Sequence, residues 1–467
     1  MTAAVEPRAF DRRLIVPLVL GAILNPINSS MLAVALVPIG LTFHAVPAQT
    51  AWLVSALYLA TATGQPVVGR LVDRYGARKL YLLGAALVGI AGVIGVLATS
   101  LGLLVLSRVL LGFGTCAGYP AAMYLIRRSG VEKPGGLLTA LSVSAQTIVV
   151  IGPTLGGLLI GAAGWRALFA VNIPLAAVCL VLGAILLPRA DGLAEFEHRL
   201  DHLGIGLFAG TLTALMLFLM SPSVGHLWLL PLTIVLAAGF VRRELRYPDP
   251  FLDVRVFGGN VPLIATYART LLAQTVAYAY LYGFTQWLEA GRGLSASHAG
   301  LVLLPMSLVA IGVSTVTGRR AEFRGKLLVG AVSQVVACAL MLVLNAASAL
   351  WLPVVISIIC GLPQGLNSLA NQNAVYFQAD ADRMGASAGL LRTFAYLGAM
   401  VSSAATGMFF RHGADTAGLH DLAVFLIVVA ALLLVLVLGD RSLRHLGDPA
   451  AGQNPETAFS GTKDGTS

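Results

Sequence analysis

The sequence predicts an all-α membrane protein that crosses the bilayer 14 times. Three observations support this fold class: the 467-residue chain is 57% hydrophobic and only 11% charged, its apolar residues gather into segments of membrane-spanning length, and its basic residues lie in alternate loops. A soluble core cannot hide so much apolar surface. The hydrophilic stretches are too short for an ATP-hydrolysing module, so any energy source is expected to be a gradient.

A helix needs roughly 20 apolar residues to cross a hydrocarbon layer about 30 Å thick. Segments close to this length occupy positions 13–36, 48–68, 79–98, 101–125, 135–160, 165–187, 203–220, 226–241, 260–288, 297–317, 326–345, 350–372, 384–408 and 421–439. The seventh and eighth segments are the weakest of the central ones. Twelve spans plus a re-entrant pair is therefore the alternative to 14 spans.

The basic residues predict how the chain is oriented. All but six of the 30 Lys and Arg residues fall in the N-terminal segment, the C-terminal tail or the loops that follow even-numbered spans. Only Arg166, Arg292 and Arg411 lie in the opposite loops. Because cytoplasmic loops carry the excess of Lys and Arg, we expect both termini in the cytoplasm and a multi-pass protein of the cell (inner or plasma) membrane. The net charge of +9 then orients the chain in lipid, and no nucleic-acid partner is expected.

A short, charge-dense turn with the sequence GRLVDRYGARK lies between the second and third spans. Gly69 and Gly76 permit close backbone approach and positive φ, while Asp73 can cap a helix or pair with Arg74 and Arg78. The spacing resembles the signature between helices two and three of major facilitator superfamily transporters. In that family the motif is a cytoplasmic latch that stabilises one gate state. A basic loop that only sets topology is the alternative.

This resemblance implies two six-helix halves around a binding site at the midplane. An extra central pair of spans is typical of the 14-helix drug:proton antiporters, and the link from Glu244 to Phe257 resembles the link into the second half of that branch. The run from Trp165 to Pro174 is similar to a sequence that recurs in the same branch. The implied organisation is an N-terminal six-helix bundle over 1–190, a central two-helix insertion over 191–245, a C-terminal six-helix bundle over 246–440 and a disordered cytoplasmic tail over 441–467.

One arginine, Arg108, lies inside the fourth span. A cation in hydrocarbon costs roughly 2.5–3.5 kcal/mol on insertion scales, so its side chain is expected to face the bundle interior and a partner. With a glycine four residues later, it resembles the family's fourth-helix motif, which is linked to proton handling, although Leu111 stands where that motif commonly has Gln. A structural role, in which the guanidinium binds backbone carbonyls, is the alternative.

The fifth span contains the sequence GPTLGG, from Gly152 to Gly157. Pro153 removes a backbone hydrogen bond and bends the helix. Gly156 and Gly157 are expected to let a helix of the other half approach closely. The sequence resembles the antiporter motif, which symporter branches generally lack, and so it favours export. Ordinary packing of small residues is the alternative.

The first span departs from the pattern of the drug:proton antiporters. That branch usually carries an Asp seven residues before the Ala of a Val-Ala-Leu run, and alignment on Val34–Leu36 places Asn28 there. An amide cannot exchange a proton near neutral pH. Apart from Glu289 and Asp421, both at outer span edges, no predicted span contains a carboxylate. Coupling to protons would then depend on Arg108 with water, Glu289, Asp73 or an acidic substrate, and uncoupled efflux is an alternative.

Polar residues inside spans predict where a substrate binds. An amide in a membrane helix normally faces inward, away from lipid, although each one singly can also join two helices. In the twelfth span the amides recur at intervals of three and four, so they share one helix face. The predicted substrate-binding residues are Asn28, Gln65, Gln146, Gln274, Tyr278, Gln364, Asn367 and Asn371. Arg269 and Arg392 are expected to snorkel or to pair with acids in the loops.

The sequence as a whole predicts a monomeric secondary exporter that works by alternating access in the lipid bilayer. Its partners are expected to be an amphipathic, drug-like small molecule and protons, in antiport. Because no fixed acid attracts cations, neutral or anionic compounds are favoured over dications. A metabolite or sugar permease and a lipid or glycolipid flippase are the alternatives with the same fold. The eight histidines and four cysteines show no catalytic or metal-ligand spacing, so neither an enzyme nor a cofactor or metal site is expected.

Overall fold

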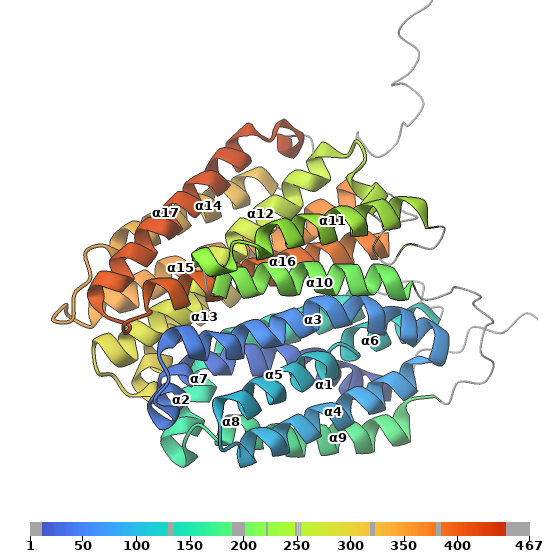
Figure 1. Ribbon diagram of the computed structural model, residues 1–467, viewed down its shortest axis with the longest axis horizontal. Helices are drawn as coiled ribbons and strands as arrows, with labels where there is room; N and C mark the ends of the chain where they lie inside the picture. Colours follow the sequence, from blue (N-terminus) through green and yellow to red (C-terminus); the bar gives the residue numbers. More distant parts are fainter. Residues whose placement is uncertain are drawn as a thin grey trace, which may run out of the picture.

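A computed structural model describes residues 12–128, 135–188, 201–220, 223–247, 250, 252, 254–317, 323–379 and 384–444. The regular elements in these ranges are all helical, and most of the helices run side by side along one direction (Figure 1). Ten helical segments in these ranges are long and apolar enough to cross a membrane. They are Ile15–Val34, Ala77–Leu97, Leu101–Ile126, Ala167–Leu186, His202–Met220, Val224–Arg246, Ala296–Thr317, Phe323–Met341, Trp351–Val375 and Thr416–Gly439. The predicted all-helical membrane fold is confirmed, and the count of 14 spans stays a prediction.

The first part of the chain forms helices that are interrupted at several points. After η1 (Arg12–Leu14) come α1 (Ile15–Ser30), η2 (Met31–Val34), α2 (Leu36–Phe43), α3 (Pro47–Tyr75), α4 (Ala77–Leu97), α5 (Leu101–Thr115), α6 (Gly118–Arg128), α7 (Gly135–Ala163), α8 (Ala167–Ala170) and α9 (Asn172–Leu186). The hydroxyl of Ser100 caps α5 by accepting a hydrogen bond from the Leu103 amide. The interruption between α1 and η2 leaves backbone carbonyls of the first span free for other partners.

The second part of the chain forms a corresponding set of helices. These are α12 (Val261–Ala279), which continues into the π-helical turns η5 (Tyr280–Phe284) and η6 (Trp287–Gly291), then α13 (Ala296–Thr317), α14 (Phe323–Met341), α15 (Trp351–Gln378), α16 (Met384–Phe409), α17 (Thr416–Gly439) and η8 (Arg441–Arg444). Asn260 caps α12 and Asp415 caps α17. π-Helical turns are frequently found at functional sites, and here η5 contains Tyr282, which lies at the interface between the two parts.

Between these two parts lie α10 (His202–Met220), η3 (Val224–His226), α11 (Leu229–Arg246) and η4 (Val254–Phe257). The α10 helix packs against α3 on one side and α16 on the other, and α11 lies on α10 (Figure 1). The segments predicted at 203–220 and 226–241 are therefore both helices. The predicted disordered tail begins with η8, and from residue 445 onward it lies outside the described residues.

Helices α3, α7, α12 and α16 coincide with the four predicted spans that are not among the ten. The first part of the chain meets the second where α3 packs along α16 and α7 along α13. Three of these four helices carry their polar residues at that interface, including Ser55 on α3, Gln274 on α12 and Ser403 on α16. These polar residues are therefore buried against protein rather than lipid.

Candidate functional site

Direct contacts between α3 and α16 close one end of the interface, the end that the basic residues predict to be the outer one. The hydroxyl of Ser55 donates to the Ser403 hydroxyl at 3.0 Å, and Ser403 donates to the carbonyl of Ala51 at 2.9 Å. Both serines are almost fully buried. A hydrogen bond between hydroxyls on two helices joins the helices and leaves neither polar group facing lipid.

Contacts between α7 and α13 close the same end through the backbone. The Thr154 hydroxyl donates to the Gly300 carbonyl at 2.9 Å, and the Ser297 hydroxyl donates to the Gly157 carbonyl at 2.7 Å. A Cβ atom on Gly157 would lie 2.5 Å from the carbonyl oxygen of Ala296, and one on Gly300 would lie 2.7 Å from that of Pro153. Only glycine fits at these two positions in this arrangement.

The other glycines of the GPTLGG sequence pack inside the first part of the chain. A Cβ on Gly152 would collide with the Ser30 hydroxyl, and one on Gly156 would lie 2.9 Å from the Met31 carbonyl oxygen. The expectation that Gly156 faces a helix of the other half is therefore wrong, because the interruption at η2 brings the first span against α7. Gly157 does face the other half, as expected.

Four tyrosines meet at the middle of the interface. Tyr58 of α3 lies beside Tyr278, Tyr282 and Tyr396, with ring centroids of Tyr58 and Tyr278 5.3 Å apart and those of Tyr58 and Tyr396 5.7 Å apart. The hydroxyls of Tyr58 and Tyr282 are 3.3 Å apart, and Tyr282 donates to the Ser29 carbonyl at 2.9 Å. Only Tyr278 was predicted from the sequence. This tyrosine cluster therefore lies between the two parts, next to aliphatic side chains such as Leu281 and Met306.

Arg108 lies next to this cluster and is 2% exposed. Its Nε donates to the carbonyl of Leu53 and its Nη1 to that of Asn28, both at 3.1 Å. Its Nη2 has no hydrogen-bond partner among the described residues. The Asn28 carbonyl belongs to the last turn of α1, where helical partners are missing. The structure thus gives Arg108 the carbonyl-binding arrangement that was the alternative to proton handling.

Asn28 forms a closed pair with Asn172 at the start of α9. Each amide donates one hydrogen bond to the other, at 2.6 and 2.8 Å, and Asn28 also donates to the Leu24 carbonyl at 2.9 Å. Both side chains are buried, and Asn28 borders a void of only about 10 Å³ beside Arg108. Asn28 therefore lies apart from the other predicted substrate-binding residues.

Two small cavities lie on the second part of the chain, towards the interface. One, of about 20 Å³, is lined by Gln274, Tyr278 and Gln364 together with Val149 of α7. The other, of about 70 Å³, is lined by residues of α12, α15 and α16, among them Gln274, Asn367 and Asn371. The structure thus brings these five predicted residues together. Gln65 bonds instead to the Tyr396 hydroxyl at 2.9 Å, and the side chain of Gln146 lies outside the described residues.

The turn between α3 and α4 contains the predicted cytoplasmic latch motif. Gly76 has φ +90°, which requires glycine, whereas a Cβ on Gly69 would meet nothing within 4 Å. Arg78 donates to the Ala184 carbonyl at 2.6 Å, and Arg74 lies over the ring of Tyr75. The neighbouring Arg70 donates to the carbonyl of Pro250 in the link that precedes α12. The side chain of Asp73 lies outside the described residues, so its predicted pairing stays a prediction.

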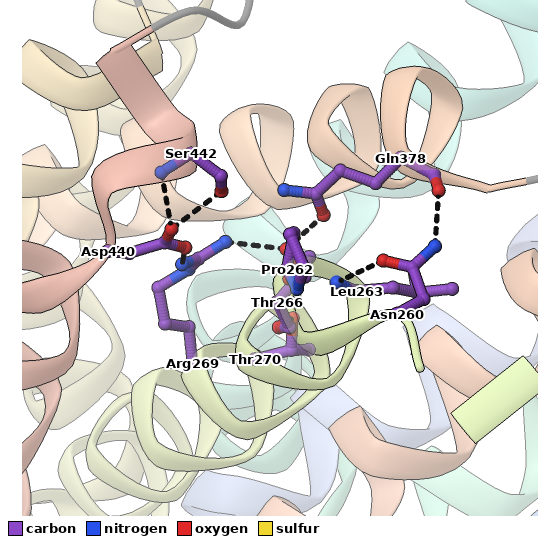
Figure 2. Close-up of polar contacts among 9 residues, drawn as sticks. All are labelled: Asn260, Pro262, Leu263, Thr266, Arg269, Thr270, Gln378, Asp440 and Ser442. Atoms are coloured by element: carbon purple, nitrogen blue, oxygen red, sulfur yellow. Dashed lines mark hydrogen bonds and ion pairs between the residues drawn. The ribbon is translucent and has the colours of Figure 1, made fainter. Parts of the chain in front are cut away.

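Arg269 joins α12 to the end of α17, as Figure 2 shows. Its fully buried guanidinium forms an ion pair with Asp440 and donates to the Thr266 hydroxyl at 2.5 Å. Thr266 in turn donates to Gln378 at 2.6 Å, and Asn260 donates to the carbonyl of Gln378 at 2.7 Å. The expected pairing of Arg269 with a loop acid is confirmed. Arg392 instead lies 3.6 Å over the centre of the Tyr119 ring.

Glu289 is a buried carboxylate in the π-helical turn η6 and is 6% exposed. Its Oε1 has no hydrogen-bond partner among the described residues. Its element contacts α13 and α17 near the end of the bundle that is predicted to be the outer one. The sequence placed Glu289 at the outer edge of a span, and the structure buries it there.

Comparisons with known proteins agree with this geometry. The model of the Major Facilitator Superfamily matches residues 18–403. The MFS-type transporter YwoD of Bacillus subtilis (strain 168), described as uncharacterized, is 32% identical over 89% of this chain and 94% of its own. The tetracenomycin C resistance and export protein of Streptomyces glaucescens is 28% identical over 83% of this chain and 74% of its own.

Solved structures show the same fold at low sequence identity. A bacterial homologue of the human lysosomal transporter Spinster, in an inward-facing and unoccupied conformation, has a TM-score of 0.67 and 16% identity. The match covers 93% of this chain and 97% of that one. At this level of identity the likeness concerns the fold alone.

Proposed function

The chain belongs to the major facilitator superfamily, and we propose that within it the protein is a secondary exporter of amphipathic, drug-like small molecules. Transport occurs by alternating access, with proton antiport as the energy source. The substrate binds on the second part of the chain, around Gln274, Tyr278, Gln364, Asn367 and Asn371. Relatives that include a resistance and export protein support the export direction.

The observation that carries the proposal is the glycine-dependent seal at the outer end of α7 and α13. Gly157 and Gly300 bring two backbones from the two parts of the chain into contact, whereas the polar cavities lie further towards the cytoplasmic ends. Such a seal must separate before a substrate leaves outward. The antiporter-like sequence around Pro153 lies at this seal, which is where a motif that controls the direction of transport is expected.

The remaining parts of the proposal concern topology. We place 14 spans in the cell membrane of a monomer, with both termini in the cytoplasm, by adding α3, α7, α12 and α16 to the ten strongly apolar segments. The turn from Gly69 to Lys79 is the cytoplasmic latch. The hydrogen bond from Arg70 to the link before α12 supports that role because it joins the first part of the chain to the segment that leads into the second.

Reconstitution in liposomes with an imposed pH gradient tests the function. With an acidic lumen, a fluorescent amphipathic compound is expected to accumulate inside, and collapse of the gradient by nigericin is expected to stop it. Neutral and anionic compounds should be transported in preference to dications. Transport that is indifferent to the gradient would remove antiport, equal transport of dications would reject the charge preference, and no transport of any compound would reject export.

Facilitated transport without proton coupling, as in a permease or a lipid flippase, is the second candidate. The Asn28–Asn172 pair supports it, because it places a neutral amide at the position where the antiporter branch usually has an acid. Fluorescent phospholipid and sugar analogues in the same liposomes distinguish these two substrates from drug-like compounds.

A further inference from the structure

We propose that the cavity of about 70 Å³ between α12, α15 and α16 is a subsite for an anionic ligand that carries a cyclic amide or imide. The proposal rests on the proposed transport function and names the substrate class of the same site. Two features of the cavity carry it: a buried amide and an arginine, of which the first has no hydrogen-bond partner and the second no carboxylate partner among the described residues.

The amide is that of Asn367 on α15, which lines the cavity and is 5% exposed. Neither its Nδ2 nor its Oδ1 has a hydrogen-bond partner among the described residues. Its side chain lies against Gly330 of α14, where a Cβ would collide with the amide. A glycine at this contact leaves room for the amide, although burial without partners is unfavourable for polar atoms. A ligand that both donates and accepts would satisfy Asn367.

A second unpaired group lies one helical turn further along α15. Asn371 also lines the cavity, is 3% exposed, and its Oδ1 has no hydrogen-bond partner among the residues described. Residues four apart share one helix face, so the two amides border the same space. Thr270 and Gln274 of α12 line the opposite wall. Neutral donors and acceptors at this density suit a planar heterocycle better than an alkyl chain.

The charge comes from Arg392 on α16, which lines the same cavity. Its guanidinium lies over the Tyr119 ring of α6, and within the described ranges it forms no ion pair. Stacking on this ring and a hydrogen bond to the Tyr396 hydroxyl use only part of the guanidinium, whose five N–H donors leave an edge for a further acceptor. A carboxylate on the ligand would make two parallel hydrogen bonds with this edge.

These two features also indicate the spacing of the ligand groups. Asn367 and Arg392 come from neighbouring helices that line one small space, so the imide and the acid must belong to one compact, rigid molecule. The imide N–H donates to Asn367 Oδ1, and an imide carbonyl accepts from Nδ2. A cation is a poor fit because Arg392 would repel it. The imide edge of the ligand enters this space, and the rest of an amphipathic substrate would extend towards Tyr278.

A fluorescent probe, 4-carboxy-1,8-naphthalimide, tests this chemistry on the unaltered protein in nanodiscs. Two analogues serve as matched comparisons: the N-methyl imide lacks the N–H donor, and the methyl ester lacks the charge. We expect fluorescence anisotropy to show saturable binding of the parent compound, with both analogues binding about tenfold more weakly or worse. Equal binding of all three compounds, or no saturable binding of the parent, would overturn the proposal.

Two variants test the proposed ligand contacts with Asn367 and Arg392. Asn367→Leu should weaken binding of the parent compound about tenfold and leave binding of the N-methyl imide unchanged. Arg392→Gln should likewise weaken binding of the parent compound about tenfold and leave binding of the methyl ester unchanged. Asn373→Leu, on the same helix but away from the cavity, and Arg246→Gln, on an exposed surface, are the controls and should bind like the unaltered protein. Loss of affinity for all compounds alike in either site variant would contradict the assignment, and the analogue comparison does not depend on how the variants fold.

Transport measured with the same protein in liposomes distinguishes failure of the subsite proposal from failure of the proposed export function. If the parent compound binds as expected but no compound is transported in liposomes, the exporter assignment fails while the subsite stands. If other amphipathic compounds are transported but the naphthalimide neither binds nor competes, the subsite fails while the function stands.

Discussion

Asn28 and Asn172 face each other across the interior of the first part of the chain and exchange two hydrogen bonds of 2.6 and 2.8 Å. Both amides are used fully, because Asn28 also donates to the Leu24 carbonyl and Asn172 to the Leu168 carbonyl. A neutral pair of this kind needs no counter-charge in the membrane. Asn28 occupies the position where the antiporter branch commonly has an acid. The hydrogen bonds of the pair therefore indicate how an aspartate at position 28 would affect stability.

Asn28→Asp is expected to make stability depend on pH. An ionised carboxylate cannot donate to Leu24 or to Asn172, so two acceptors are left unsatisfied at a cost of about 1–3 kcal/mol. A protonated carboxyl regains one donor. The melting temperature of the variant, measured by thiol-reactive fluorimetry from pH 8 to pH 5, should therefore rise towards that of the unaltered protein as pH falls. Asn345→Asp, at an exposed loop position, is the control, and a pH-independent deficit at Asn28 would contradict the argument.

Gly300→Ala is expected to disfavour the state in which the outer end is closed. The added Cβ would lie 2.7 Å from the Pro153 carbonyl oxygen, a backbone atom that cannot move aside. Ser297→Cys in the same background should then react faster with a membrane-impermeant maleimide from outside, and transport should fall about tenfold. Gly312→Ala on the same helix has open space around its Cβ and serves as the control. Unchanged maleimide labelling would show that the seal tolerates a methyl group.

The sequence predicted the fold and one wall of the site better than it predicted the interface. The periodic amides Gln364, Asn367 and Asn371 were expected to share a face, because helical spacing is a local property. The partner of Asn28 is 144 residues away, and no local pattern connects the two. The tyrosine cluster was largely missed because Tyr58 resembles any aromatic residue packed in a span until its helix is placed against α12. Gly156 was misassigned because the interruption at η2 was not predicted.

The ion pair between Arg269 and Asp440 is expected to be strongly coupled. Removal of either partner leaves the other charge buried, which costs about 3–5 kcal/mol. Arg269→Leu and Asp440→Leu should each lower the melting temperature substantially, and the double variant should be less affected than either single change predicts. A double-mutant cycle in the same detergent measures this coupling. Strictly additive losses would mean that each residue acts through separate contacts, such as Thr266 for the arginine and Ser442 for the aspartate (Figure 2).

Arg108 is expected to be needed for the structure of the first part of the chain rather than for its charge alone. Its guanidinium binds the carbonyls of Asn28 and Leu53, and so ties the end of α1 to α3. Hydrogen bonds to a charged group contribute about 1.5–3 kcal/mol each. Arg108→Gln should therefore lower the melting temperature at all pH values and abolish transport. Arg108→Lys keeps the charge but has no planar fork to reach two carbonyls. It should destabilise nearly as much as Arg108→Gln, whereas full stability with lost pH-gradient coupling would instead favour a role in proton handling.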